Sequence, residues 1–410
     1  MRFLKGDTLS AMQPKIVFNR MELAGALGDL GTLLPIAVAM ILLNGLNPVG
    51  IFFSIGLFYI VSGLVFGVTV PVQPMKVIGA YAIAMALPPQ QILASGLLVG
   101  VFLLVIAMTG AVDMISRLTP KPVVRGVQLS TGALLAAGGV KLIIGASAYQ
   151  TLQQAAEPYL AVQTVAGIPI GIVIGIIGGF VTLLLLDNQR VPAGLAVILG
   201  GGAIGLLLGK PGALAAMNVS IHLPQWMPLA MPSMPDFSIA LIALVLPQIP
   251  MTLGNAVFAY TDLSKQYFED SSARVTNRNV CLSMAAANIL SFFIGGMPLC
   301  HGAGGLAAHY RFGARTAGSN LMIGAIFIGL ATLLGRDIVA VIHLLPMAVL
   351  GILLIFAGLQ LTLTIMDLEG RREYFIAMVI LGITLASNLA AGFLCGIAVA
   401  YLLKWQKLSV

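Results

Sequence analysis

Charged side chains are scarce in this chain: Asp, Glu, Lys and Arg make up 9% of its 410 residues, against about 25% in an average soluble domain. Hydrophobic residues make up 59%, and the mean hydropathy is +1.03. A soluble globular domain is therefore excluded. Apolar runs such as residues 168–186 recur along the whole length, and a helix that crosses a bilayer needs about 20 such residues. The sequence predicts a polytopic helical membrane protein.

Several signatures that would indicate another function are missing. The three cysteines, Cys281, Cys300 and Cys395, have neither metal-binding spacing nor a disulfide framework, and we expect them to serve only in packing. Neither a nucleophile elbow nor a P-loop occurs, which argues against an enzyme and against direct use of ATP. The Lys and Arg residues are scattered over short loops, so the net charge of +7 does not indicate nucleic acid. No cofactor or metal is expected.

The apolar runs predict an all-α membrane protein with fourteen transmembrane segments. Each predicted segment lies between two polar breaks, and its ends are uncertain by a few residues. The segments are 21–43, 50–70, 74–88, 91–110, 126–146, 163–186, 192–209, 238–260, 279–296, 300–313, 316–334, 337–366, 373–388 and 389–405.

The distribution of Lys and Arg predicts which side of the membrane each loop faces. Residues 1–20 are polar and basic, without the apolar core and cleavage site of a signal peptide, and we expect a retained cytoplasmic tail. With that placement, four Lys or Arg lie in the tail and thirteen in the other inside loops and the C-terminal end, which is 17 of the 21. This bias predicts cytoplasmic termini, including residues 406–410, in the inner (plasma) membrane of the cell.

The predicted segments divide into two halves of seven. The longest external break, residues 210–237, separates a first repeat at 21–209 from a second at 238–405. Because seven is odd, the second half enters the membrane with the opposite topology, as in the inverted repeats of many transporters. The third segment of each half is short and begins in a proline-bearing stretch, VPVQPMK (70–76) in the first and GMPLCHGAGG (296–305) in the second.

These paired breaks predict an anion-binding site. Pro71 and Pro74 forbid a regular helix in the first break, and Pro298 with nearby glycines does so in the second, so each short helix would begin near the middle of the bilayer. A helix N-terminus presents unpaired N–H groups and a partial positive charge. Lys76 adds a full charge, although it could instead snorkel or pair with Asp29. A single break would often be only a kink.

Polar residues elsewhere in the apolar segments supply further candidates. Asp29 is the one acidic residue deep in an apolar run, and an intramembrane carboxylate is by default a functional hypothesis, here for proton coupling or for holding a buried cation. Gln248, Thr252 and Asn255 share one helix face, and neutral amides and hydroxyls are suitable donors to an oxyanion. They could equally bridge helices.

Four stretches resemble the molybdate transporter family, a relative of the sulfate permeases: GDLGTLLPI (28–36), PVQPMKVIGA (71–80), LPQIPMTLGNAVFA (246–259) and GGMPLCHGAGGLAAHYRFGAR (295–315). The resemblance implies the fold of sulfate and uracil permeases, with fourteen segments in two inverted repeats that form core and gate domains. It also implies a substrate between the third and tenth segments, elevator-like movement and, by analogy, a homodimer. Sulfate permeases usually carry a cytoplasmic regulatory domain after the last segment, and we expect none after Val410.

We therefore expect a secondary transporter that imports molybdate through the lipid bilayer, with Asp29 as the proton-coupling residue. Sulfate, tungstate or a nucleobase would be alternative cargoes for this fold, and an anion channel or a membrane enzyme would be alternatives of other classes. The expected substrate-binding residues are Gln73, Pro74, Met75, Lys76, Gln248, Thr252, Asn255, Cys300, His301, Gly302, Ala303, Gly304 and Gly305.

Overall fold

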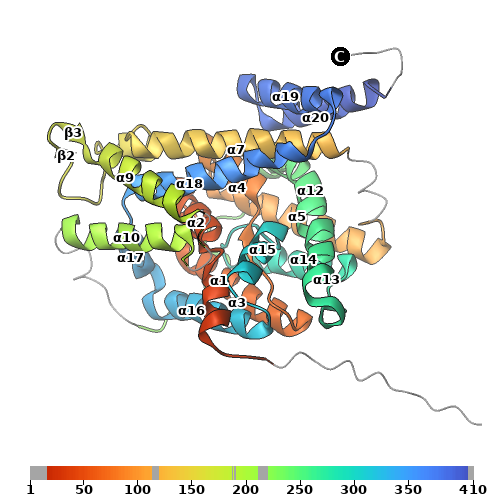
Figure 1. Cartoon of the computed structure of the whole chain (residues 1–410), viewed down its shortest axis with the longest axis horizontal. Coiled ribbons are helices and arrows are strands. Elements are labelled where there is room, and N and C mark those ends of the chain that lie inside the picture. Colours follow the sequence, from red (N-terminus) through yellow and green to blue (C-terminus); the bar gives the residue numbers. More distant parts are fainter. Residues whose placement is uncertain (1–15, 113–119, 187, 189–190, 211–219, 405–410) are drawn as a thin grey trace, which may run out of the picture.

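The computed structural model describes residues 16–112, 120–186, 188, 191–210 and 220–404. The described chain is mostly helical, and its helices pack into one bundle (Figure 1). Six helical runs are long and apolar enough to cross a membrane, and the bent pair Arg20–Leu27 and Leu30–Asn44, with an angle of 48°, would make a seventh. Several other predicted segments correspond to shorter apolar helices, including Lys76–Met85, Ile170–Leu185, Ala193–Leu208 and Leu389–Leu402.

The first half begins with a capped helix and contains three short strands among its helices. The side chain of Asn19 accepts hydrogen bonds from the N–H groups of Met21 and Glu22, which starts the first helix. The elements are α1 (Arg20–Leu27), α2 (Leu30–Asn44), α3 (Pro48–Phe66), β1 (Gln73–Pro74), α4 (Lys76–Met85), α5 (Pro89–Thr109), α7 (Lys121–Ile143), α8 (Ala148–Leu152), β2 (Thr164–Val165), β3 (Ile168–Pro169), α9 (Ile170–Leu185) and α10 (Ala193–Leu208).

The second half opens with one long helical run that contains two stretches of the wider π-helix. These are η1 (Ala240–Val245) and η2 (Thr252–Ala259), and π-helical turns are frequent at functional sites. The remaining elements are α11 (Met234–Ile239), α12 (Leu246–Met251), α13 (Tyr260–Phe268), η3 (Glu269–Ser272), α14 (Asn277–Phe293), β4 (Leu299–Cys300), α15 (Ala303–Arg311), α16 (Ala317–Leu334), η4 (Gly335–Asp337), α17 (Ile338–Ile342), α18 (Met347–Thr362), η5 (Leu363–Asp367), α19 (Arg371–Ala386) and α20 (Leu389–Leu402).

The structure corrects two predicted segments. Residues 337–366 are not one helix, because α17 ends at Ile342 and Pro346, whose ring cannot continue a helix, directly precedes α18. The segment predicted at 163–186 begins with the hairpin of β2 and β3, and its helix starts only at Ile170. Most of the predicted N-terminal tail, residues 406–410 and residues 211–219 of the predicted linker lie outside the described residues.

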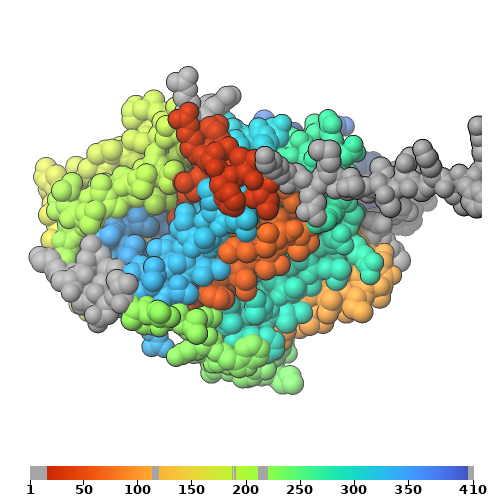
Figure 2. Space-filling model, turned by 90° about the horizontal axis from the view of Figure 1, so that it is seen from below, coloured from red at the N-terminus to blue at the C-terminus, as the bar shows by residue number. Residues whose placement is uncertain are grey.

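The helices form two groups that pack against each other. We call α7, α9, α10, α18, α19 and α20 the α7–α18 layer, because α7 and α18 pack along each other and the rest pack on them or on one another. We call α1 to α5 with α11 to α16 the strand-pair bundle, since it contains β1 and β4. Figure 1 shows α7 and α18 lying across one end of this bundle. Figure 2 shows that α1, α3 and α16, from different halves of the chain, form adjoining parts of one face.

Candidate anion-binding site

The two predicted breaks are present and lie against each other. Strands β1 and β4 are antiparallel, with Gln73 opposite Cys300 and Pro74 opposite Leu299. The N–H group of Met75 also donates to the carbonyl oxygen of Pro298 at 3.0 Å. Helix α4 leaves one strand and α15 follows the other, so the beginnings of both short helices are held next to the same two-stranded pair.

Buried amides satisfy the extended backbone of both breaks. Asn320 on α16 accepts a hydrogen bond from the N–H of Val70 and donates one to its carbonyl oxygen, at 2.9 and 2.8 Å. Asn288 on α14 bonds the N–H and the carbonyl oxygen of Leu299 in the same way, at 3.0 and 2.7 Å. Because unpaired backbone groups are costly in a bilayer, these two asparagines allow non-helical chain in the interior.

The N-terminus of α4 is capped by a side chain from the second half. The Oε1 atom of Gln248 accepts hydrogen bonds from the N–H groups of Val77 and Ile78, at 3.0 and 3.2 Å. Its Nε2 atom donates to Thr252 Oγ1 at 3.0 Å. Gln248 and Thr252 are both almost fully buried, so they fix the position of α4 and leave its first residue, Lys76, at the edge of the site.

The N-terminus of α15, unlike that of α4, has no side chain among the described residues that accepts hydrogen bonds from its N–H groups. Gly302 takes the cap position without a side-chain hydrogen bond. Within the described part of the chain, the N–H groups of Ala303, Gly304 and Gly305 have no hydrogen-bond acceptor. A Cβ atom added to Gly304 would meet nothing within 4 Å, because this residue faces an open space. The first turn of α15 can therefore donate to a bound anion.

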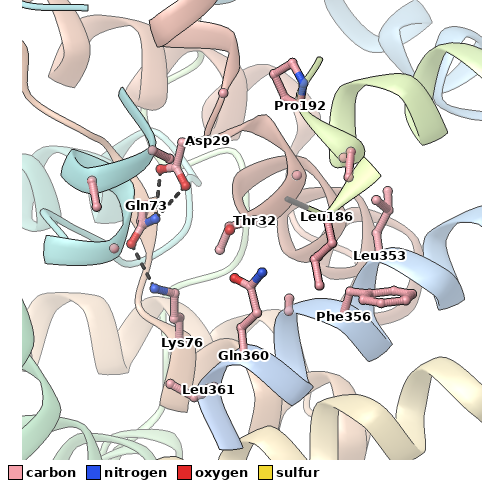
Figure 3. Close-up of a pocket in the computed structure, with 18 of the residues that line it drawn as sticks. Asp29, Thr32, Gln73, Lys76, Leu186, Pro192, Leu353, Phe356, Gln360 and Leu361 are labelled. Carbon is pink, nitrogen blue, oxygen red and sulfur yellow. Dashed lines mark hydrogen bonds between the residues drawn. The ribbon is translucent and has the colours of Figure 1, made fainter. Parts of the chain in front are cut away.

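Three polar side chains from the first half form a continuous chain beside these donors (Figure 3). The Nε2 atom of Gln73 donates to both carboxylate oxygens of Asp29, at 2.7 and 2.8 Å. The Nζ atom of Lys76 donates to Gln73 Oε1 at 2.9 Å. Asp29 and Lys76 thus do not form the direct ion pair that was one expectation, because a neutral amide lies between the two charges.

These groups line a cavity of about 400 Å³ between the strand-pair bundle and the α7–α18 layer. Asp29, Gln73, Lys76, Asn255 and Gly304 contribute from the bundle. The opposite wall is formed by residues of α7, α9, α18, η5 and the start of α10, and most of them are apolar. Among the described residues, no group of three or more His, Cys, Asp or Glu side chains is arranged to hold a metal ion.

The structure brings only some of the predicted site residues to the cavity. His301 is fully buried behind β4, where Nδ1 bonds the carbonyl oxygen of Pro71 at 2.9 Å and the ring stacks on Tyr260. Cys300 Sγ lies 3.7 Å from the carbonyl oxygen of Pro74. The remaining predicted residues that do not line the cavity are Pro74, Met75, Gln248, Thr252, Gly302, Ala303 and Gly305.

Several polar residues of the cavity wall were not among the predicted candidates: Thr32, Gln128, Thr182, Arg311, Gln360 and Thr364. Gln128 accepts hydrogen bonds from Arg125 and from Thr364, both at 2.9 Å, which ties α7 to η5. Arg125 in turn pairs with Asp367. These residues of the cavity wall come from several helices of both halves, and only the packing of those helices shows that they face one cavity.

Comparison with known proteins assigns the family. The family described as "Molybdate transporter of MFS superfamily" matches residues 21–135 and 240–361. Molybdate transporter 2 of Arabidopsis thaliana is 32% identical over 95% of this chain and 88% of its own length. The chain belongs to the molybdate transporter family. Molybdate transporter 1 of Chlamydomonas reinhardtii is 29% identical over 92% of this chain and 90% of its own length.

Solved structures of anion transporters share the fold of this family member. The transmembrane domain of the cyanobacterial bicarbonate transporter BicA has a TM-score of 0.62 and 15% identity, over 93% of this chain and 97% of that one. Murine Slc26a9, an anion transporter in the inward-facing state, has a TM-score of 0.66 and 14% identity, over 96% and 69%. The family and the fold are those of integral membrane transporters of anions, not of enzymes.

Proposed function

We propose that this protein is a secondary transporter that imports molybdate, and that the anion binds in the cavity between Lys76 and the first turn of α15. The observation that carries the proposal is that Lys76 and Gly304 both line this cavity, and that the N–H groups in the first turn of α15 have no acceptor within the described chain. We choose molybdate as the substrate because the relatives that align along almost the whole chain are named molybdate transporters.

The charges of the site support binding of a dianion. Lys76 offers one positive charge, and the N-terminus of α15 adds a partial positive charge in a region where water is scarce. Asp29 would hold the opposite charge when ionised, and Gln73 lies between it and the Lys76 ammonium. A proton on Asp29 would remove the carboxylate charge that opposes an incoming anion.

Proton coupling through Asp29 would also lower the electrical cost of import. Moving one negative charge against an inside-negative potential of 100 mV costs about 2.3 kcal/mol. Each proton that enters with molybdate removes one such charge from the total. Asp29 is suited to this role because it is 3% exposed, lines the cavity and contacts the Lys76 ammonium only through an amide.

The two helix groups are suited to alternating access. We infer fourteen segments in two inverted repeats, with the strand-pair bundle as the core domain and the α7–α18 layer as the gate domain. The cavity lies between them, so an elevator-like movement of the bundle would carry the anion across. Cytoplasmic termini in the plasma membrane, and a homodimer, belong to the same proposal.

The test is binding of molybdate to the purified full chain, with excess sulfate or tungstate as competitor. We expect molybdate binding to survive excess sulfate and to be lost in Lys76→Ala and Gly304→Leu, because one variant removes the ammonium and the other fills the open space. Lys141→Ala and Gly200→Leu are matched controls, since Lys141 is exposed and Gly200 is an exposed helix residue with nothing near its Cβ position.

Different results would redirect the assignment. A folded wild-type protein that binds sulfate in place of molybdate would overturn the cargo and keep the site. Binding that persists in both site variants would overturn the location. Currents far above carrier turnover in reconstituted membranes, with no saturation at low substrate, would indicate a channel.

A further inference from the structure

Gln360 is a polar residue on an otherwise apolar stretch of α18. Leu353, Phe356 and Ala357 precede it on the same helix face, at spacings of seven, four and three residues, and all of them line the cavity. Gln360 is exposed to this cavity, and Figure 3 shows its amide pointing into the space toward Thr32. A side chain of this kind in a membrane segment normally faces a partner or a pathway.

No structural partner accounts for Gln360. Within the described residues, its side-chain amide has no hydrogen bond. The other polar side chains on the same wall each make at least one hydrogen bond: Gln128 accepts through Oε1 from Arg125 and Thr364, and Thr182 donates to the carbonyl oxygen of Gly178 at 2.7 Å. Among the described residues of this wall, Gln360 is therefore the polar side chain with no hydrogen bond at either amide atom, and both atoms are available to a ligand.

The position of Gln360 suits a tetrahedral oxyanion. Lys76, Asn255 and the first turn of α15 all lie on the bundle side, so they reach only the oxygens that face the bundle. An anion with oxygens in four directions also presents acceptors to the opposite wall. An amide donates a hydrogen bond without adding charge. A donor at this place would complete the shell of the anion when the two helix groups approach each other.

We propose that Gln360 is a substrate-binding residue supplied by the α7–α18 layer, and that it contacts an oxygen of the oxyanion held by Lys76 and α15. The inference rests on the proposed function and extends it to the second wall of the site. It gives the α7–α18 layer a direct part in recognition, in addition to forming the surface against which the bundle moves.

The experiment measures the dissociation constant of molybdate for the purified full chain by calorimetry, together with its melting temperature. Gln360→Leu keeps the volume and removes the donor, and we expect about 10- to 100-fold weaker binding, as for loss of one hydrogen bond to a charged group. Gln360→Glu places a negative charge in the same space and should weaken binding at least as much. Gln360→Asn keeps an amide and should recover part of the affinity.

Leu359→Ala is the matched control, because Leu359 is the exposed neighbour on α18 and does not line the cavity. The melting temperature of every variant should stay near that of the wild type, since Gln360 makes no contact that the fold needs. Unchanged molybdate affinity in both Gln360→Leu and Gln360→Glu, with a wild type that binds, would overturn this inference alone. If the wild type binds sulfate but not molybdate, the affinities of the same variants are compared for sulfate. A wild type that binds neither anion overturns both proposals.

Discussion

The amide nitrogen of Gln73 lies 2.7 and 2.8 Å from the two carboxylate oxygens of Asp29, and its amide oxygen lies 2.9 Å from the ammonium of Lys76. One neutral side chain therefore fixes the orientation of both a buried acid and a cation. Gln73 donates to Asp29 and accepts from Lys76, so the orientation of its amide depends on an acceptor at position 29.

The first prediction concerns Asp29→Asn. We expect uptake driven by a proton gradient to fall at least about 10-fold, because an amide at this position cannot carry a proton, while binding of molybdate is retained. The measurement is uptake into proteoliposomes with and without an inward proton gradient. Asp262→Asn, at an exposed site on α13, is the control. Full gradient-driven uptake in Asp29→Asn would remove Asp29 from the coupling mechanism.

The second prediction compares Gly305 with Gly304. A Cβ atom at Gly305 would lie 2.6 Å from Asp29 Oδ2 and 2.7 Å from Gln73 Nε2, whereas one at Gly304 would meet nothing within 4 Å. We expect Gly305→Ala to lower the free energy of unfolding by about 1 to 3 kcal/mol, as overpacking does. Gly304→Ala should leave the melting temperature nearly unchanged. Equal melting temperatures for the two variants would contradict the close approach of Gly305 to the acid and the amide.

The third prediction concerns the cap of α4. Gln248→Leu removes the acceptor for two N–H groups in the first turn of this helix, and we expect a loss of stability of about 0.5 to 2 kcal/mol. Molybdate affinity should also fall, because the displaced first turn carries Lys76. Gln248→Glu keeps an acceptor and should recover part of the stability. If Gln248→Leu leaves both the stability and the molybdate affinity unchanged, the N–H groups of Val77 and Ile78 must find other acceptors.

The fourth prediction concerns Glu157, in the segment between α8 and β2. Its two carboxylate oxygens accept hydrogen bonds from the N–H groups of Met347 and Ala348, both at 2.8 Å, and so cap α18. Burial raises the pKa of Glu157 from its usual 4.5 to about 7, although the two N–H groups lower it. The folded protein therefore keeps this proton between pH 4.5 and 7 while the unfolded chain loses it.

The sign of the effect follows from this difference in protonation. The folded state binds more protons in that range, so the contribution of Glu157 to stability is largest below pH 4.5 and falls as the pH rises to 7, by on the order of 3 kcal/mol. Melting curves in detergent from pH 4.5 to 8 test it. Glu157→Gln should flatten the curve over this range, and a wild-type melting temperature that rises with pH by an amount absent in the variant would refute the assignment.

The positions of the two breaks along the chain could be predicted because prolines leave a strong local signal. Pro71, Pro74 and Pro298 exclude helix over short stretches whatever the rest of the chain does. Lys76 also lies where the sequence suggests, at the first residue of α4. The sequence predicts two helix ends that face each other, but it does not predict that β1 pairs with β4. A strand of two residues is too short for its sequence pattern to identify the partner strand.

The roles of the other candidates depended on contacts across the two halves. Gln248 was expected to face the substrate, yet it caps α4, since the shared helix face of Gln248, Thr252 and Asn255 does not tell which neighbour each side chain meets. Of the three, Asn255 lines the cavity. Gln360 was missed because a single amide in an apolar helix carries no periodicity. Its importance becomes visible only when α18 is packed against the bundle.

The pairing of β1 with β4 has a consequence for how the protein is made. The partners of Gln73 and Pro74 are residues 299 and 300, and the N–H and carbonyl of Val70 need Asn320. While the ribosome is still producing the second half, the extended chain before α4 has none of these partners, and bare backbone groups are not stable in lipid. We therefore expect the extended chain before α4 to reach its final conformation only after residues 299–320 have been made.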